Sequence, residues 1–176
     1  TNYYFEIAQE DGDKKYGKSK EHRPNPIIQM GLFTDGDGLP LAFSLFPGNQ
    51  NEQKSLKPLE TKILQQFGCK KFIYCSDAGL ASEDNRVFNH MGQRAFIVTQ
   101  SIKKLPAEDR TWALDRCGFK RLTDDVPVDI TKLSEDDKDH LYYKDEPFTT
   151  KRLHQRLIIT YSPKYAAYQK VVRAEQ

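Results

Sequence analysis

The residue best suited to chemistry is Asp77, in the stretch Ser76-Asp77-Ala78-Gly79. Residues 72–75 before it are apolar without polar alternation, which predicts a strand covered on both faces. Ser82 is a good N-cap for a helix over residues 83–91. Asp77 is therefore expected at the carboxyl end of a buried strand, where open α/β sheets bind ligands, and carboxylate oxygens suit Mg²⁺. The alternative is a turn residue that bonds its own backbone.

Basic residues gather in three places. The first cluster lies within ten residues, and the others follow after residue 100. They comprise Lys14, Lys15, Lys18, Lys20, His22 and Arg23; then Lys103, Lys104 and Arg110; then Lys151, Arg152, His154 and Arg156. Such runs are usually solvated faces. Three of them in a chain of net charge +2 favour a partner lined with phosphates.

The elements that would position Asp77 alternate between strand and helix over residues 1–100. We expect strands at 3–8, 27–34, 39–46, 72–75 and 94–99, with helices from about 55 to 67 and over 83–91. Asp35-Gly36-Asp37-Gly38 predicts a hairpin turn, and Gly68 a helix C-terminus. The order β-β-β-α-β-α-β indicates an antiparallel three-strand meander followed by strands added through helical crossovers.

Residues 101–176 have a different, charge-dense character. We expect a short helix over 107–114 and two strands, 141–143 and 157–161, that are candidates for pairing. Ser162-Pro163 predicts the start of a last helix that runs past Arg173. The sequence thus divides into a core, 1–100, and a following α+β region, 101–176.

Length and composition exclude several classes of protein. A chain of 176 residues suits one domain, or one domain with an insertion, and no apolar run approaches the roughly 18 residues of a membrane span. Three cysteines without a C-x-x-C pair argue against a disulfide framework and a zinc site, and fit a reducing cytosol. The chain opens directly on strand-like residues without Met, so we expect a fragment.

Six phrases give the chain a family resemblance. They are Asn2-Tyr3-Tyr4-Phe5-Glu6, Lys15-Tyr16-Gly17-Lys18-Ser19-Lys20-Glu21-His22-Arg23-Pro24, Gly38-Leu39-Pro40-Leu41, Phe46-Pro47-Gly48-Asn49, Ser76-Asp77-Ala78-Gly79 and Tyr161-Ser162-Pro163-Lys164-Tyr165. In this order the chain resembles the catalytic domain of bacterial insertion-sequence transposases of the DDE type. The resemblance implies a ribonuclease-H-like α/β fold: a mixed sheet of meander and parallel strands with helices on its faces, and a partial insertion region at the C-terminal end.

The resemblance also implies a chemistry. Three carboxylates, Asp-Asp-Glu, hold two Mg²⁺ ions about 3.5–4 Å apart, one activating the attacking oxygen and one stabilising the leaving oxygen. Asp77 matches the second aspartate. The first would stand just before Thr1 or Asn2, and the glutamate beyond the end of the chain; Glu175 lies in the wrong phrase and is left unassigned. We therefore expect a fragment that cannot cut DNA by itself.

The implied partners are double-stranded DNA, as transposon ends and target, and a second copy in a homodimer, in the bacterial cytoplasm. Lys18, Lys20, His22 and Arg23 are the candidate phosphate contacts, against the alternative of a solvated loop. Trp112 is either a packing anchor or, as in the family, a platform that stacks on a flipped base.

Three further groups of residues have plainer interpretations. Asp35 and Asp37 suit a turn better than a calcium site. Glu6 is expected to be solvent-exposed rather than directed at a metal. Loop geometry alone accounts for Asn49, with a position near Asp77 as the alternative.

Two other functions remain open at this point. One is a non-catalytic DNA-binding module, or domesticated remnant, that uses only the basic loop. The other is a ribonuclease-H-like nuclease that acts as a monomer and hydrolyses without joining ends.

Overall fold

The chain is a mixed α/β protein with antiparallel and parallel sheets. The computed structural model describes residues 2–18, 21–68 and 71–175. It divides into two compact units, Thr1–Ser101 and Ile102–Gln176, a boundary next to that drawn from the sequence after residue 100. Each unit is described by itself.

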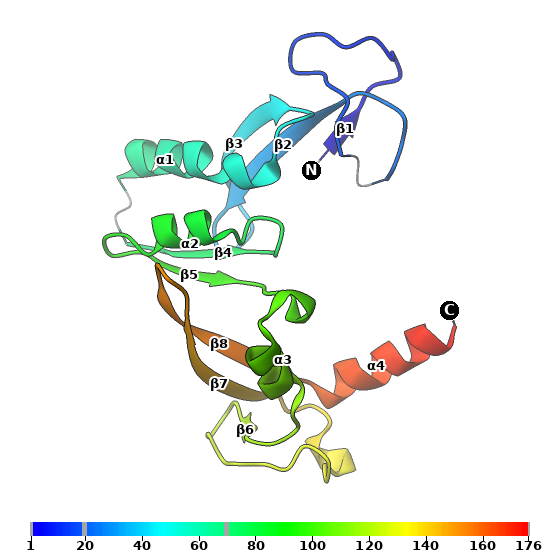
Figure 1. The fold of residues 1–176 in the computed structure, drawn as a ribbon, viewed down its shortest axis with the longest axis vertical. Coiled ribbons are helices and arrows are strands. Elements are labelled where there is room, and N and C mark those ends of the chain that lie inside the picture. Colours follow the sequence, from blue (N-terminus) through cyan, green and yellow to red (C-terminus); the bar gives the residue numbers. More distant parts are fainter. Residues whose placement is uncertain (1, 19–20, 69–70, 176) are drawn as a thin grey trace. The chain divides into compact units, whose positions relative to one another are not determined.

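The first unit follows the predicted order of elements (Figure 1). In chain order these are β1 (Asn2–Tyr4), β2 (Ile27–Thr34), β3 (Pro40–Pro47), the 3-10 helix η1 (Glu52–Lys54), α1 (Leu56–Phe67), β4 (Ile73–Ser76), α2 (Glu83–Asn89) and β5 (Ala95–Val98). Strands β1, β2 and β3 form the expected antiparallel meander. At the hairpin, Oδ1 of Asp35 accepts the amides of Asp37 (3.0 Å) and Leu39 (2.9 Å), which confirms the turn interpretation.

The first strand is shorter than the predicted 3–8. It ends at Tyr4, and the last ladder contact beyond it is the amide of Phe5 to the carbonyl of Pro26 (3.1 Å). The partner strand cannot extend further back, because Pro26 has no amide hydrogen to donate and Pro24 precedes it closely. Glu6 lies outside the strand and is exposed, as expected.

Helix α1 covers one face of the meander. Its apolar stripe buries Leu56, Leu59 and Ile63, as predicted, and Gly68 ends the helix with a left-handed φ of 62°. A Cβ on Gly31 of β2 would lie only 3.2 Å from the Leu59 side chain. Glycine at this position therefore allows the helix to approach the sheet closely.

Strands β4 and β5 form a parallel pair of their own. Their register runs from Ile73 opposite Ala95 to Ser76 opposite Val98. Within the described residues neither strand is hydrogen-bonded to the meander, so the single mixed sheet expected from the sequence is not formed. Side chains make contact between the two sheets instead: the ring centroids of Phe33 and Tyr74 lie 6.1 Å apart.

The expectation that the β4 strand is covered on both faces is wrong. Tyr74 is 4% exposed, but Ile73 is 62% exposed and Cys75 is also exposed. The two-stranded sheet of β4 and β5 is thus packed on the face that carries Tyr74, while the face that carries Ile73 and Cys75 is exposed. Burial raises the pKa of Tyr74 to about 12.

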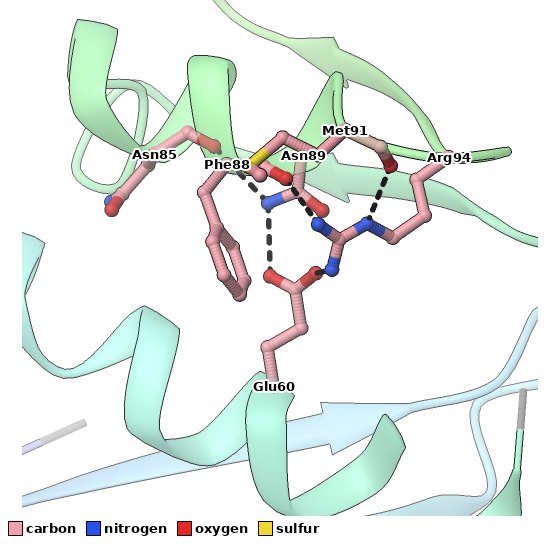
Figure 2. Close-up of polar contacts among 6 residues, drawn as sticks. All are labelled: Glu60, Asn85, Phe88, Asn89, Met91 and Arg94. Atoms are coloured by element: carbon pink, nitrogen blue, oxygen red, sulfur yellow. Dashed lines mark hydrogen bonds and ion pairs between the residues drawn. The ribbon is translucent and has the colours of Figure 1, made fainter. Parts of the chain in front are cut away.

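A buried polar cluster fastens α1 to α2 and to Arg94, the residue before β5 (Figure 2). Glu60 of α1 is 1% exposed; its Oε2 accepts from Nδ2 of Asn89 (2.9 Å), and its Oε1 pairs with Nη1 of Arg94 (3.4 Å). Arg94 also donates to the carbonyls of Phe88 and Met91. Burial raises the pKa of Glu60, while the Asn89 hydrogen bond and the Arg94 charge oppose that rise.

The second unit centres on a three-stranded antiparallel sheet with the order β6-β7-β8. Its elements are η2 (Ile102–Lys104), α3 (Ala107–Leu114), β6 (Lys120–Arg121), η3 (Glu135–Asp137), β7 (Tyr142–Thr149), β8 (His154–Tyr161) and α4 (Pro163–Ala174). The short helix has its predicted bounds, and the last two strands are paired but longer than predicted. Ser162 caps α4 by accepting the amide of Tyr165, as its sequence indicated.

Trp112 is a packing anchor in this unit. It packs against a buried cluster of Leu105, Ala113 and Leu157. Its ring also lies 4.7 Å from Nζ of Lys144, a lysine that is only 3% exposed. The Lys144 ammonium donates to the carbonyls of Trp112 and Asp115 at 2.5 and 2.6 Å. The packing interpretation of Trp112 is thereby confirmed.

No helix in residues 2–18, 21–68 and 71–175 combines the length and the apolar character needed to cross a membrane.

Candidate functional site

Asp77 lies where the sequence placed it, directly after the last residue of β4. Its side chain is exposed, and its Oδ1 accepts the amide of Gly79 (2.9 Å). The turn interpretation is therefore confirmed together with the position at the strand end. Oδ2 of Asp77 makes no hydrogen bond to any described residue, so one carboxylate oxygen remains open to a ligand.

Gln53 of η1 holds the segment that follows Asp77. Its Nε2 donates to the carbonyl of Gly79, and its Oε1 accepts the amide of Ser82 (3.0 Å). Asn85 of α2 also binds Gln53: its Nδ2 donates to the Gln53 carbonyl (3.1 Å). Asn51, the N-cap of η1, accepts the amide of Gln53 and fixes its backbone (3.0 Å). The turn after Asp77 is thus held by an element that lies far away in the sequence.

A second carboxylate lies beside the same turn. A Cβ placed on Gly79 would lie 3.0 Å from Oδ1 of Asp77 and 3.6 Å from Oε2 of Glu52. Both carboxylates therefore lie close to Gly79. Carboxylate oxygens are the ligands that hard divalent cations prefer.

A pocket of about 750 Å³ opens beside this turn. Its lining comes from the loop residues Gly17, Lys18 and His22, from residues 48–53, and from Gln29 and Gly79. Asn49, for which a position near Asp77 was the alternative, lines the same pocket as Gly79. This volume lies within the range of small-molecule pockets.

The candidate DNA contacts have different surroundings. Lys18 and His22 line the pocket, and His22 has a left-handed φ of 55°, an uncommon backbone conformation that histidine adopts more readily than most residues. Arg23 forms an ion pair with Glu21 (2.6 Å) and lies over the Tyr4 ring, 5.2 Å from its centroid. Lys20 lies outside the described residues.

Sequence reasoning missed the amides that shape the pocket. Gln29 is 7% exposed on β2, and its Nε2 donates to the carbonyls of Gly48 (3.0 Å) and Gln50 (2.8 Å). A signal was present: Gln29 is a polar residue within an apolar strand, and residues 49–53 are an unbroken run of Asn, Gln and Glu. Buried amides of this kind need partners, so each predicts a nearby backbone bend.

The residues fit part of a magnesium site. Asp77 offers an open carboxylate oxygen, and Glu52 lies beside the same glycine. Within the described residues no group of three or more His, Cys, Asp or Glu side chains is arranged to hold a metal ion. What this chain supplies is thus one strand-end carboxylate with a second nearby.

Comparisons with family models, with curated proteins and with solved structures found nothing that matches this chain.

Proposed function

We propose that this chain is a fragment of the catalytic domain of a DDE-type DNA transposase with a ribonuclease-H-like fold. The intact protein would cleave DNA strands and transfer them, which makes it a nucleotidyl-transferring DNA endonuclease. Asp77 is the second of its three catalytic carboxylates.

One observation supports this proposal above the others. Asp77 follows β4, the first strand of a parallel pair joined through α2, and it keeps one carboxylate oxygen open beside a pocket that is lined by Lys18 and His22. A carboxylate for a metal and cations for phosphate are the two needs of phosphodiester chemistry.

Magnesium, when bound, would activate the attacking oxygen and stabilise the leaving one. Asp77 would hold it from this chain. The pocket next to Asp77 would accept the DNA strand, with Lys18 and His22 directed at phosphates. The family resemblance assigns no further residue of 1–176 to the other two carboxylates, so we expect no DNA cleavage by this chain alone. Action as a homodimer on DNA ends in the bacterial cytoplasm completes the proposal.

The test uses the longer protein that contains this chain and the variant Asp77→Cys. A thiolate is a poor ligand for Mg²⁺ but a better one for Mn²⁺. We expect strand cleavage and joining to be lost in Mg²⁺ and partly restored in Mn²⁺. Asp37→Cys, at the exposed hairpin tip, is the matched control and should retain activity in both metals. Unchanged activity of Asp77→Cys in Mg²⁺ would overturn the proposal.

A non-catalytic DNA-binding module is the second candidate, favoured by the lack of a third metal ligand in the described part of the chain. It predicts DNA binding that weakens steeply with salt and no metal-dependent nicking at full length. A nuclease of the same fold would nick DNA but would not join 3′-ends to new DNA, so product analysis separates it from a transposase.

A further inference from the structure

The contacts of Gln53 reach Asp77 through one residue. The carbonyl of Gly79 accepts from Nε2 of Gln53, and the amide of Gly79 donates to Oδ1 of Asp77 (2.9 Å). One bond uses the carbonyl of Gly79 and the other uses its amide. Any movement of the Gln53 amide therefore shifts the group that orients the Asp77 carboxylate.

Both polar ends of the Gln53 side chain take part in this role. Its Oε1 accepts from the Ser82 amide (3.0 Å) and from Nδ2 of Asn85 (3.4 Å), while Nε2 is directed to Gly79. It thus holds both ends of the segment between Asp77 and α2. The segment's own backbone contributes the weaker contact of the Leu80 amide to the Asp77 carbonyl (3.4 Å).

We propose that Gln53 is a positioning residue that sets the orientation of the Asp77 carboxylate for a divalent cation. This inference rests on the proposed function for the metal, while the orienting contact itself does not. Outer groups that orient a metal ligand typically change metal affinity by 10–100-fold when they are removed. Neither Gln53 nor its contacts need touch the ion.

The geometry also predicts which part of the side chain matters. Gln53→Glu keeps an oxygen for Ser82 but loses the Nε2 hydrogen that reaches Gly79, and it places a second oxygen against the Gly79 carbonyl. Gln53→Ala loses both contacts. Gln50→Ala is the matched control, because Gln50 lines the same pocket and its side chain makes no hydrogen bond to a described residue.

The experiment is NMR spectroscopy of the 176-residue chain, with Mn²⁺ as the paramagnetic probe. In the absence of metal, Gln53→Ala and Gln53→Glu should move the Gly79 amide and the Asp77 carboxyl resonances, and Gln50→Ala should leave both in place. With Mn²⁺, broadening centred on Asp77 should need about 10-fold more metal in Gln53→Ala than in wild type. Thermal unfolding of each variant checks that the fold persists, and Gln53→Glu serves if Gln53→Ala does not fold.

The outcomes separate the two hypotheses. The metal role of Asp77 fails if Mn²⁺ broadens no resonance near Asp77 in wild type, or if the broadening persists in Asp77→Ala. In that case the resonance shifts measured without metal still decide whether Gln53 orients the Asp77 carboxylate. If both Gln53 variants leave the Asp77 carboxyl and Gly79 amide resonances unmoved, the positioning role is overturned. It is equally overturned if Mn²⁺ binds near Asp77 with the same half-saturation in wild type and Gln53→Ala.

Discussion

Two carboxylates of the first unit, Glu60 and Asp77, have opposite surroundings. Glu60 is 1% exposed, and both its oxygens are engaged, one by Asn89 and one by Arg94. Asp77 is exposed, and only one of its oxygens is engaged, by a backbone amide of its own turn. The buried Glu60 carboxylate is committed to contacts within the protein, whereas the exposed Asp77 carboxylate has an oxygen that a ligand can reach.

The difference separates a charge that serves stability from a charge that is available for the proposed function. Removing one partner of a buried pair is costly because the other charge stays in the interior. Removing an exposed carboxylate with a single backbone contact costs little. Stability and metal binding should therefore be separable in this unit by substitution at the two positions.

The largest expected effect is that of Glu60→Ala. The Arg94 guanidinium, 10% exposed, and the Asn89 amide would lose their common acceptor. We expect a loss of about 3–5 kcal/mol in the free energy of unfolding, measured by urea denaturation. Asp77→Asn, the comparison variant, should change this free energy by less than about 0.5 kcal/mol. Equal losses in the two variants would contradict the contrast between them.

Lys144 extends the comparison to a buried cation in the second unit. Its ammonium is satisfied by carbonyls and by the rings of Trp112 and Phe119 rather than by a carboxylate. Lys144→Met keeps the volume but leaves the carbonyls of Trp112 and Asp115 without this donor, so we expect a loss of about 2 kcal/mol in urea unfolding. Lys164→Met, at an 80% exposed side chain, is the control and should be nearly neutral. A neutral Lys144→Met would show that the rings and water satisfy these carbonyls equally well.

The pH dependence of stability is a smaller effect. The pKa of Glu60 in the folded chain is raised above the unfolded value of 4.5. Between these two pKa values the folded chain therefore binds more protons than the unfolded chain. The contribution of Glu60 to the free energy of unfolding is then greatest below pH 4.5, and it falls as the pH rises toward the pKa of the folded chain. Glu60→Gln removes the titration, so the unfolding free energy of wild type minus that of Glu60→Gln should decrease upward from pH 4.5. A difference that increases with pH would mean that Arg94 outweighs burial.

Gly79→Ala should have the smallest effect on stability and still alter the site. The new Cβ would lie 3.0 Å from Oδ1 of Asp77, too close unless the carboxylate rotates. We expect less than about 0.5 kcal/mol of destabilisation together with weaker Mn²⁺ binding in an NMR titration. Gly36→Ala, in a turn with no atom within 4 Å of its Cβ, is the control. Identical Mn²⁺ titrations for the two variants would place the metal away from Gly79.

The elements of the fold could largely be predicted from local patterns. The apolar stripe of α1, the Asp35 hairpin and the Ser162 cap depend on residues close in sequence, and all three are confirmed. The burial of β4 could not be predicted in the same way. An apolar run such as residues 72–75 occurs both in strands with one buried face and in strands with two. Which of these forms depends on how the sheets pack together, and the run itself does not record that.

For the site, the sequence indicated Asp77 but not the residues that hold it. A turn aspartate has a recognisable pattern, and its position after a strand follows from the order of elements. Gln53 lies 26 residues before Gly79, and its contact is made only when η1 and the segment after β4 come together. Sequence patterns concern residues close together in the chain, so they do not predict a hydrogen-bond partner for Gln53 that lies 26 residues away.

That separation has a consequence for the persistence of the site. The amide of Ser82 is tied to Oε1 of Gln53 and not to its own helix, so a fluctuation that parts η1 from this segment releases it while α1 and α2 stay intact. Such openings require only a fraction of the global unfolding free energy. Hydrogen–deuterium exchange should therefore find the Ser82 amide less protected than those within α1, and the arrangement around Asp77 would be lost and regained many times in the lifetime of one folded molecule.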